Sequence, residues 1–259
     1  MPFAKINGIE LYYELHGAGP DLVLAHGGGG NHLSWWQNVP ELSKYFRCLT
    51  FDHRGFGDSR DVGGAGPGAF VEDLRQLLDH LGIARAALVG QSMGGWTVFG
   101  FAASFPSRVS ALVLCDTTAG LDDPEVIRAQ NALRTTLRGG LQQTLARAYA
   151  AQFPERDPVR CFLYQQISGL NRDVPGNLIA ALGALRYQPA PVVEAGIPAM
   201  LIVGEEDALI APATMELMAK RLPQSHLVRV PQAGHSVYFE QPEKFNRLLV
   251  DFLRERVRG

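Results

Sequence analysis

One stretch constrains the fold of this chain more than any other, the run from Ala86 to Gly95 with the sequence AALVGQSMGG. Its first residues are apolar and predict a buried parallel strand, and the residues after it are compatible with a helix up to Phe105. Between the two lies Gly-x-Ser-x-Gly, a pattern that places a serine at a sharp turn from strand to helix. We expect Ser92 to adopt a strained backbone conformation at this turn, with its hydroxyl held clear of the sheet.

The two glycines of this pattern have a steric explanation. A Cβ atom at Gly90 or Gly94 is expected to collide with the neighbouring strand or helix. The helix that follows would aim its unpaired N–H groups and its positive end at the serine oxygen. The alternative is a glycine-rich turn with an incidental serine, because the five-residue pattern alone is common. The strand before it and the helix after it favour a nucleophilic serine.

Strand-like and helix-like segments alternate along most of the chain, which predicts an α/β fold. We expect a mostly parallel, eight-stranded sheet with helices on both faces. The expected strands are residues 3–6, 9–14, 21–25, 46–51, 86–90, 109–115, 199–203 and 227–230, and the expected helices are residues 34–42, 70–81, 93–105, 212–222 and 242–257.

Residues 121–195 interrupt this alternation. They predict short helices with arginine-rich polar faces, separated by prolines at 154, 158, 175 and 189. We interpret them as a small helical cap inserted between core strands, so that residues 1–120 and 196–259 form the core. Because the charges of the segment are about balanced, its arginines are interpreted as a solvated face rather than an anion site.

Composition narrows the class of protein. With 259 residues, 46% of them hydrophobic, the chain is long enough for one large α/β domain with an insertion. Its formal net charge of −2 gives no reason to expect nucleic acid or a membrane as a partner. Three cysteines do not make a disulfide framework, and the N-terminus lacks the apolar core of a signal peptide. We therefore expect a cytoplasmic protein; the sequence does not predict its oligomeric state.

A serine hydroxyl needs a base to take its proton at neutral pH, and His235 is the candidate. It lies in the loop PQAGHS, just after the last expected strand and before the last helix. Loops that leave the carboxyl ends of parallel strands meet at one edge of a sheet, so His235 and Ser92 are expected to meet there. A surface loop histidine is the alternative. By contrast, His80 lies inside an amphipathic helix and His226 opens a strand, so both are interpreted as structural.

The base in turn needs a carboxylate that fixes its tautomer and stabilises the imidazolium. Asp207 is the preferred candidate, because it lies a few residues past the strand 199–203, at a distance that lets it reach back to the histidine. Glu205 and Glu206 are expected to be solvated or bonded to their own loop. The rival is Asp116, which follows the strand 109–115. That strand is expected to end at the same edge of the sheet.

A developing oxyanion needs N–H donors that are placed in advance. The N–H of Met93, at the start of the helix, is one expected donor. The second is expected from the glycine run after His26, where absent side chains let the backbone approach closely. Gly28 is the preferred residue and Gly27 its alternative, while His26 is expected to brace the loop.

Three aromatic residues near the serine or the histidine in sequence are candidates for lining a substrate pocket: Trp36, Trp96 and Tyr238. A core position on the helix after the glycine run is an equal alternative for Trp36.

Taken together, these residues resemble the α/β-hydrolase family over essentially the full length of the chain. The matching motifs are His26-Gly27, Asp52-x-Arg54-Gly55-x-Gly57-x-Ser59, Gly90-x-Ser92-x-Gly94-Gly95, Gly204-x-x-Asp207, and Gly234-His235 with Glu240-x-Pro242. The resemblance implies a serine hydrolase with the triad Ser92, Asp207 and His235, without metal or cofactor. It also implies that the residue after the His-Gly pair, Gly28, donates to the oxyanion, and that the Asp52 motif is mainly structural.

Within that family, the run SMGG at Ser92 and the run LVLCDT at residues 112–117 resemble the carboxylesterase and 3-oxoadipate enol-lactonase branch. They are also similar to hydrolases that cleave carbon–carbon bonds of ring-fission products. Haloalkane dehalogenases and epoxide hydrolases carry an aspartate where this chain has Ser92, which argues against both. The four glycines after His26 depart from the enol-lactonase pattern. The expected reaction is therefore cleavage of a small ester or lactone, with carbon–carbon hydrolysis, a cofactor-free lyase or oxygenase, and a slowly hydrolysing ligand receptor as alternatives.

Overall fold

A computed structural model describes residues 2–136 and 147–256. Eight strands form one sheet in the order β1-β2-β4-β3-β5-β6-β7-β8. The pairs β1–β2 and β2–β4 are antiparallel and all the other pairs are parallel. The strands are β1 (Phe3–Ile6), β2 (Ile9–His16), β3 (Asp21–Ala25), β4 (Arg47–Phe51), β5 (Ala86–Gln91), β6 (Val109–Cys115), β7 (Ala199–Gly204) and β8 (Ser225–Val230). The predicted mostly parallel, eight-stranded sheet is thereby confirmed.

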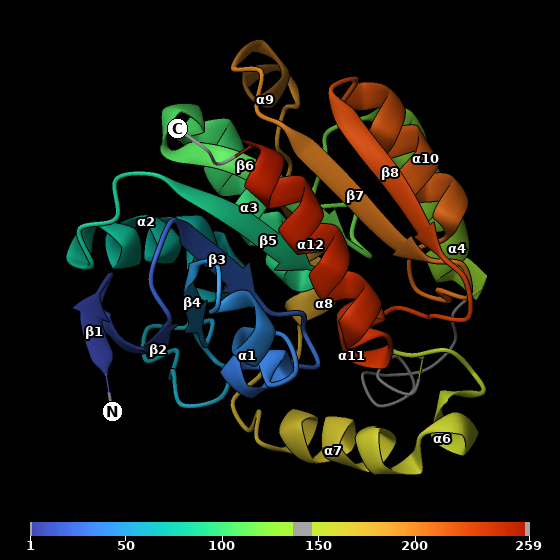
Figure 1. Cartoon of the computed structure of the whole chain (residues 1–259), viewed down its shortest axis with the longest axis horizontal. Helices are drawn as coiled ribbons and strands as arrows, with labels where there is room; N and C mark the ends of the chain where they lie inside the picture. The colour runs from blue at the N-terminus through green and yellow to red at the C-terminus, as the bar shows by residue number, and fades with distance from the viewer. Residues whose placement is uncertain (1, 137–146, 257–259) are drawn as a thin grey trace.

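Helices cover both faces of the sheet (Figure 1). One face is covered by α2 (Phe70–His80), α3 (Met93–Ser104), α9 (Ala190–Glu194) and α10 (Pro212–Arg221). The other is covered by η1 (His32–Trp35), α1 (Val39–Leu42), α11 (Val237–Glu240) and α12 (Pro242–Arg256). Each set buries its apolar side chains against the sheet, so two separate cores lie on either side of it.

The central strands are buried along their whole length. Every residue of β5, β6 and β7 is buried, as expected for parallel strands that are covered on both faces. The flanking helix α2 buries Phe70, Leu74, Leu77 and Leu78 on one side, and Gly82 follows it with φ +64°. The apolar runs and periodicities of the sequence therefore fold as predicted in these elements.

Two local expectations were wrong. The single helix expected over residues 34–42 is split into η1 and α1, because the side chains of Asn31 and Ser34 form a capping box around η1 and Pro40 occupies the first turn of a new helix. The strand β2 continues to His16 rather than ending at Glu14, because its last four residues pair with β4. The last helix was expected to reach Val257, which lies outside the described residues; α12 is described to Arg256.

The segment between β6 and β7 contains α4 (Pro124–Thr136), α6 (Phe153–Arg156), α7 (Pro158–Gly169) and α8 (Leu178–Ala184), followed by α9. In Figure 1, α6 and α7 lie beyond the end of the sheet to which the β7 arrow points. Of the other helices in this segment, α4 packs on α10, and α9 packs on α3. Residues 137–146 of the predicted cap lie outside the described residues, and the division of the chain into core and cap stays a prediction.

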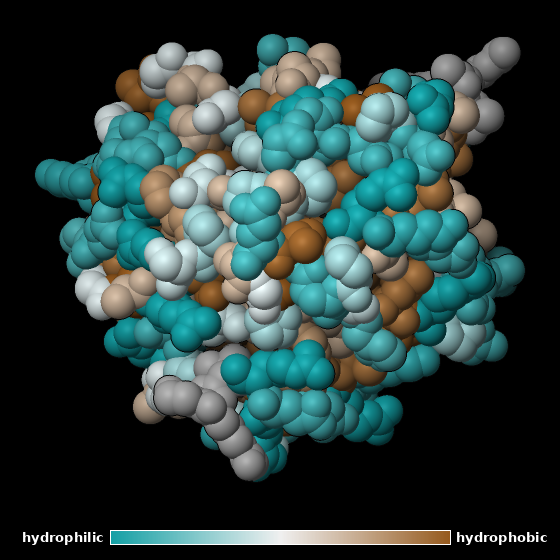
Figure 2. Space-filling model, turned by 90° about the horizontal axis from the view of Figure 1, so that it is seen from above, coloured by the Kyte–Doolittle hydropathy of each residue, from teal (hydrophilic) through white to brown (hydrophobic). Residues whose placement is uncertain are grey.

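No helix within residues 2–136 and 147–256 is both long enough and apolar enough to span a bilayer. On the face seen in Figure 2, apolar residues lie in separate patches between polar ones.

Candidate active site

Ser92 occupies the turn between β5 and α3 with φ 48° and ψ −116°, a strained conformation for a residue with a Cβ atom. Backbone contacts hold it there. Its N–H donates to the Cys115 carbonyl oxygen at 2.9 Å, and its own carbonyl oxygen accepts from the Gly95 N–H at 2.9 Å and from Thr117 Oγ1 at 2.7 Å. The strained turn is therefore fastened on both sides, to the end of β6 and to the first turn of α3.

The glycines around Ser92 are required for the reason that the sequence indicated. A Cβ atom built on Gly94 would lie 2.1 Å from the carbonyl oxygen of Ala25 in β3, and one on Gly90 would lie 2.5 Å from Val98 Cγ2 in α3. The Cβ on Gly90 would also lie 2.6 Å from the Gly94 carbonyl oxygen, so at both positions a backbone atom stands in the way. These contacts let α3 begin directly above the sheet, which brings the Ser92 hydroxyl to its edge.

Thr117 offers a test of how the turn is held. Replacing Thr117 by valine keeps the volume of the side chain but removes the hydrogen bond to the Ser92 carbonyl and leaves the Ala119 N–H without its acceptor. We expect the free energy of unfolding to fall by about 1–3 kcal/mol, the usual effect of a buried polar group that loses its partner. Urea denaturation of the wild type and the Thr117→Val variant measures this free energy. An unchanged midpoint would contradict this account of the turn.

His235 lies in the loop between β8 and α11, and its imidazole joins two residues that are far apart in the sequence. Its Nε2 is 2.8 Å from Ser92 Oγ and its Nδ1 is 2.9 Å from Asp207 Oδ2. The side chain of Gln91 holds the loop by donating to the His235 carbonyl oxygen at 2.7 Å. A hydroxyl, an imidazole and a carboxylate therefore form one hydrogen-bonded line at the carboxyl edge of the sheet.

Asp207 is fixed by the loop that follows β7. Its Oδ1 accepts the N–H groups of Leu209 and Ile210 at 2.7 and 2.9 Å, which leaves Oδ2 for His235. The rival, Asp116, is completely buried next to this line, where its Oδ1 accepts the Gly204 N–H at 2.9 Å. Of the two carboxylates, the structure thus brings Asp207 into hydrogen-bonding contact with the imidazole.

The charges of the site act on the histidine. Burial by itself lowers the pKa of His235, but the charge and hydrogen bond of Asp207, together with the charges of Asp116 and Glu240, raise that pKa above its usual value. Burial, assisted by the nearby charge of Asp207, raises the pKa of Asp116 to about 8.

The glycine run lies directly beside the serine. A Cβ atom on Gly27 would lie 3.2 Å from Ser92 Cβ, so the backbone of this loop passes the nucleophile at close range. Gly28 sits in a turn that is closed by a hydrogen bond from the Gly30 N–H to the Gly27 carbonyl oxygen at 3.0 Å. Met93 is the first residue of α3, where an N–H has no acceptor within its own helix.

His26 braces this loop, as expected. Its Nδ1 is 2.8 Å from the Gly27 carbonyl oxygen, and its Nε2 accepts the backbone N–H of His53 at 3.0 Å. Burial lowers the pKa of His26 to about 4, so the ring is neutral and Nδ1–H is the donor to Gly27. This histidine therefore supports the glycine run and is separate from the Ser92–His235 line.

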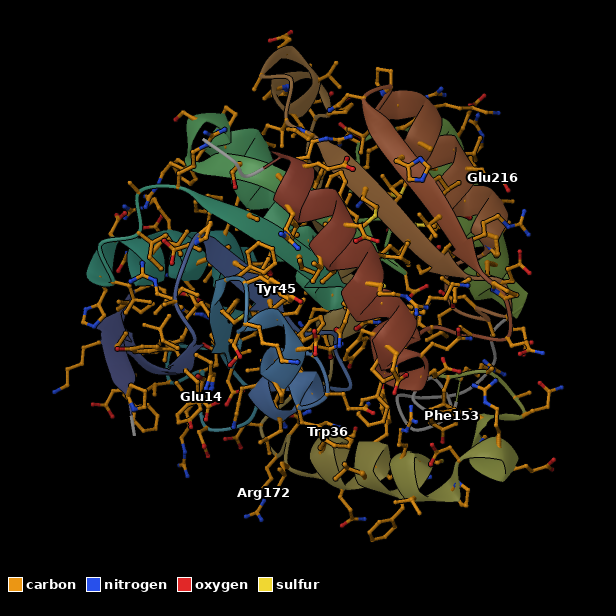
Figure 3. The ribbon with its side chains drawn as sticks, viewed as in Figure 1. Glu14, Trp36, Tyr45, Phe153, Arg172 and Glu216 are labelled. Carbon is orange, nitrogen blue, oxygen red and sulfur yellow. The ribbon has the colours of Figure 1, made fainter. Side chains whose placement is uncertain are left out.

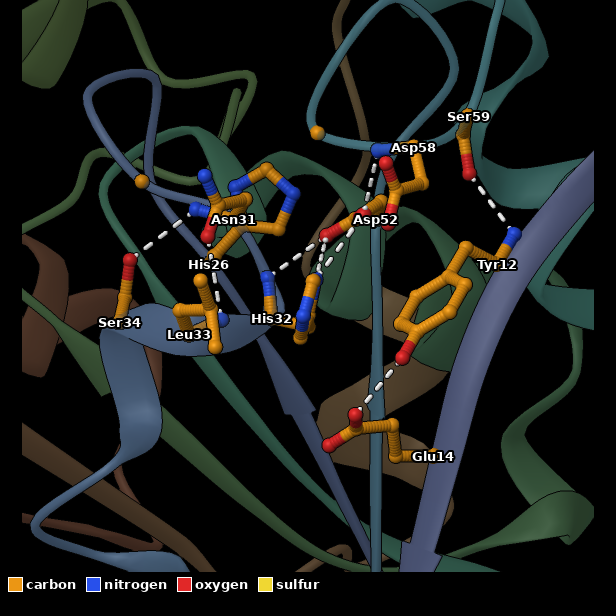
Figure 4. A network of polar contacts seen from close by, with 12 residues as sticks. Tyr12, Glu14, His26, Asn31, His32, Leu33, Ser34, Asp52, Asp58 and Ser59 are labelled. Atoms are coloured by element: carbon orange, nitrogen blue, oxygen red, sulfur yellow. Dashed lines mark hydrogen bonds and ion pairs between the residues drawn. The ribbon is translucent and has the colours of Figure 1, made fainter. Parts of the chain in front are cut away.

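A second network ties the same loop to the end of β4 (Figure 4). Asp52 accepts the backbone N–H of His32 at 2.6 Å and lies 2.9 Å from its ring Nδ1, while its other oxygen accepts the Asp58 N–H at 2.8 Å. Arg54 forms a buried ion pair with Asp73 at 2.5 Å. The charged residues of the Asp52 motif thus hold loops together.

The three aromatic pocket candidates lie in different surroundings. Trp96 is buried and lines a small pocket between α3, α4 and α8, together with Thr118, Gly120 and Leu121. Tyr238 is 1% exposed and stacks in the core on Trp35, with ring centroids 4.5 Å apart. Trp36 is 43% exposed and lies between α1 and α7 (Figure 3). That Trp36 and Tyr238 line a substrate pocket stays a prediction.

Sequence reasoning missed several residues around this site. Thr117 and Gln91 hold the backbone of Ser92 and His235, and Leu178 of α8 comes within 3.5 Å of the position of a Cβ atom on Gly28. Gln91 and Thr117 lie inside motifs that the sequence analysis used, but the motifs do not predict their contacts with distant parts of the chain. Within the described ranges, no cluster of three or more His, Cys, Asp or Glu residues could hold a metal ion.

The model of the alpha/beta hydrolase family matches residues 22–248, and the chain belongs to this family of hydrolases. A thermophilic esterase from Thermogutta terrifontis superimposes with a TM-score of 0.83 at 30% identity, covering 98% of this chain and 99% of that one. The enol-lactonase from Burkholderia xenovorans LB400 superimposes with a TM-score of 0.81 at 29% identity, covering 98% and 100%. The chain is also 31% identical over 250 residues, 90% of its length and 89% of the other, to a protein of Bacillus subtilis strain 168 whose name gives it provisionally as a 2-succinyl-6-hydroxy-2,4-cyclohexadiene-1-carboxylate synthase.

Proposed function

We propose that this protein is a serine hydrolase that cleaves a small carboxylic ester or lactone through an acyl-enzyme on Ser92. The observation that carries the proposal is the line of hydrogen bonds from Ser92 Oγ to His235 Nε2, 2.8 Å, and from His235 Nδ1 to Asp207 Oδ2, 2.9 Å. This order of groups activates a hydroxyl for attack on a carbonyl carbon.

The first half of the proposed reaction forms the acyl-enzyme. His235 Nε2 takes the proton of the Ser92 hydroxyl as its oxygen attacks the carbonyl carbon of the substrate. Asp207 stabilises the imidazolium that results, and the N–H groups of Met93 and Gly28 hold the negative oxygen of the tetrahedral intermediate. The intermediate collapses when its C–O bond to the alcohol breaks and His235 returns the proton to the departing alkoxide.

The second half releases the acid. A water molecule gives a proton to His235 and attacks the acyl carbon, and the bond to Ser92 Oγ breaks as the proton returns to it. For a lactone, the alcohol stays attached to the acyl chain, so ring opening and hydrolysis give one product. The two relatives that superimpose best among those described above, an esterase and an enol-lactonase, support this class of substrate.

A second candidate is a reaction other than hydrolysis on the same scaffold. It is favoured by the similarity to the Bacillus subtilis protein, whose name describes a synthase. The same serine, imidazole and carboxylate would then act without an acyl-enzyme, because a fold does not fix the chemistry that its residues perform.

A substrate panel combined with active-site labelling separates the two candidates. The purified protein is assayed with short p-nitrophenyl esters, lactones of several ring sizes and ring-fission products, and is then treated with a serine-reactive phosphonate. Turnover of esters or lactones, with the label mapped to Ser92 by mass spectrometry, is the expected result. Label at Ser92 without turnover of any ester or lactone would favour the second candidate, and a label on another residue would contradict both.

The acid limb of the pH profile is a further prediction. Only the neutral imidazole of His235 can accept the serine proton, and the carboxylates near it raise its pKa above 6.5. We therefore expect kcat/KM for a neutral ester to fall as the pH drops, with the midpoint of that limb above pH 6.5. A kcat/KM that stays constant from pH 8 down to about pH 5 would show that His235 is not the base.

A further inference from the structure

Glu240, the last residue of α11, is a buried carboxylate with no place in the mechanism above, and its side chain is fully enclosed. Its Oε1 accepts the backbone N–H of Gly234 at 2.9 Å and that of Ser236 at 3.4 Å. These are the residues immediately before and after His235. One carboxylate oxygen therefore holds both ends of the short backbone stretch that presents the imidazole to Ser92.

The other oxygen of Glu240 reaches a part of the chain that is distant in sequence. Its Oε2 accepts the backbone N–H of Ala150 at 3.0 Å, ninety residues away. Ala150 lies in the segment between β6 and β7, just before α6. The two backbones also touch directly, because a Cβ atom on Gly234 would lie 2.3 Å from the Ala150 nitrogen. Glu240 thus bridges the loop of His235 and the residues that precede α6.

Arginines of α6 and α7 complete the contacts of Glu240. The guanidinium of Arg156 lies 3.8 Å from Glu240 Oε2 and donates to the Gln232 carbonyl oxygen at 2.9 Å. Arg160 of α7 lies 3.4 Å from the Glu240 carbonyl oxygen. Phe153, the first residue of α6, is buried beside them (Figure 3). Both helices are therefore attached to the same few residues around His235.

A buried carboxylate of this kind is costly unless its oxygens are occupied. Burial raises the pKa of Glu240, while the N–H groups of Ala150, Gly234 and Ser236 and the charge of Arg156 favour its ionised form. An apolar residue in this place could accept none of these N–H groups. The negative charge also reaches the imidazole, since Glu240 is one of the groups that raise the pKa of His235.

We propose that Glu240 is a positioning residue that fastens the His235 loop to the segment before α6, so that the imidazole stays aligned with Ser92 only while that segment is docked. The proposal rests on the proposed function, because it gives Glu240 a part in the same reaction. In this arrangement the residues between β6 and β7 shape the substrate site and also set the position of the base.

The test compares Glu240→Gln with Glu243→Gln. Glu243 is an exposed carboxylate three residues further along, so it undergoes the same chemical change without these contacts. Glutamine at 240 keeps the length of the side chain but presents an NH₂ group to one of the N–H donors and removes the charge. We expect kcat for ester hydrolysis to fall by about 10- to 100-fold with a smaller change in KM, the effect of a misaligned catalytic group. Glu243→Gln should match the wild type.

The pH profile separates positioning from mere support of the fold. Three carboxylates act on the imidazole of His235, namely Asp207, Asp116 and Glu240. Loss of the Glu240 charge should therefore shift the acid limb of kcat/KM to lower pH. A Glu240→Gln protein that melts at a lower temperature but keeps the wild-type kcat and acid limb would overturn the proposal.

Arg156→Met provides a second variant if Glu240→Gln does not fold. The Arg156 side chain is 40% exposed, so its replacement is tolerated more easily, and it loosens α6 from both Glu240 and Gln232. A fall in kcat in the same direction, about 2- to 10-fold, is expected, since a smaller displacement of the base costs less of the rate. Wild-type kcat in this variant would overturn the proposal. If instead the wild-type protein neither hydrolyses esters or lactones nor labels at Ser92, the proposed function itself has failed.

Discussion

Replacing Ser92 by alanine is expected to lower kcat for ester hydrolysis by about 10⁴- to 10⁶-fold, the range measured when the nucleophile of such a site is removed. Without Oγ no acyl-enzyme forms, and only the oxyanion donors and substrate binding remain. The fold should survive the change. Alanine accepts the φ of 48° about as readily as serine does, and the three hydrogen bonds that hold the turn all involve its backbone.

Single-turnover and steady-state assays with a p-nitrophenyl ester measure this loss, and urea denaturation checks the fold. We expect the free energy of unfolding to change by no more than about 1 kcal/mol, because only the hydrogen bond to His235 disappears. The phosphonate should no longer label the protein. A Ser92→Ala variant that keeps a tenth or more of the wild-type kcat would show that another residue is the nucleophile.

The second large effect distinguishes the two buried aspartates. Asp207→Asn is expected to lower kcat by about 10⁴-fold, since an amide at this position favours the wrong imidazole tautomer and cannot stabilise the imidazolium. Asp116→Asn should lower kcat by less than about tenfold. Both ring nitrogens of His235 are engaged by Asp207 and Ser92, so replacing Asp116 leaves the two hydrogen bonds of the imidazole in place.

The pair of variants serves as its own control, because both replace a buried carboxyl by an amide beside the same histidine. Asparagine at 116 can still accept the Gly204 N–H through its Oδ1. Steady-state kinetics at pH 7 and circular dichroism of both variants are the measurements. If Asp116→Asn proves the more damaging in kcat while both proteins stay folded, Asp116 and not Asp207 is the acid that supports His235.

Local features of the sequence predicted most of the sheet. Apolar runs of five to seven residues, each ending in a polar or glycine-rich loop, indicated β3 and the buried strands β5, β6 and β7 with an error of at most one residue. The amphipathic spacing of α2 and the glycine after it were equally informative. Two predictions failed for different reasons. Residues 34–42 split because of local signals, the capping box of Asn31 and Ser34 and the proline at 40, whereas β2 was extended by its tertiary pairing with β4.

The candidate site was predictable to the extent that it depends on the strand ends. Ser92 and His235 both follow a strand of a parallel sheet, so topology alone brings them to one edge. Tyr238 shows where that reasoning stops. Its place three residues after His235 suggested a pocket, but the spacing did not predict that Tyr238 would be 1% exposed with its ring stacked on Trp35. Such an orientation depends on packing, which sequence spacing does not describe.

The sequence by itself determined the elbow at Ser92, because the strand before Gly-x-Ser-x-Gly and the helix after it are local features, and a Cβ atom on Gly90 would collide with Gly94 and Val98 of the same elbow. It favoured Asp207 and left Asp116 as a rival, since both follow strands that end at the same edge. Only the tertiary structure decided, by engaging one oxygen of Asp207 with two backbone N–H groups and turning the other to His235. The physical reason is the separation along the chain over which each interaction acts. Steric limits act between neighbouring residues, whereas a hydrogen bond between groups 28 residues apart exists only after the chain has packed.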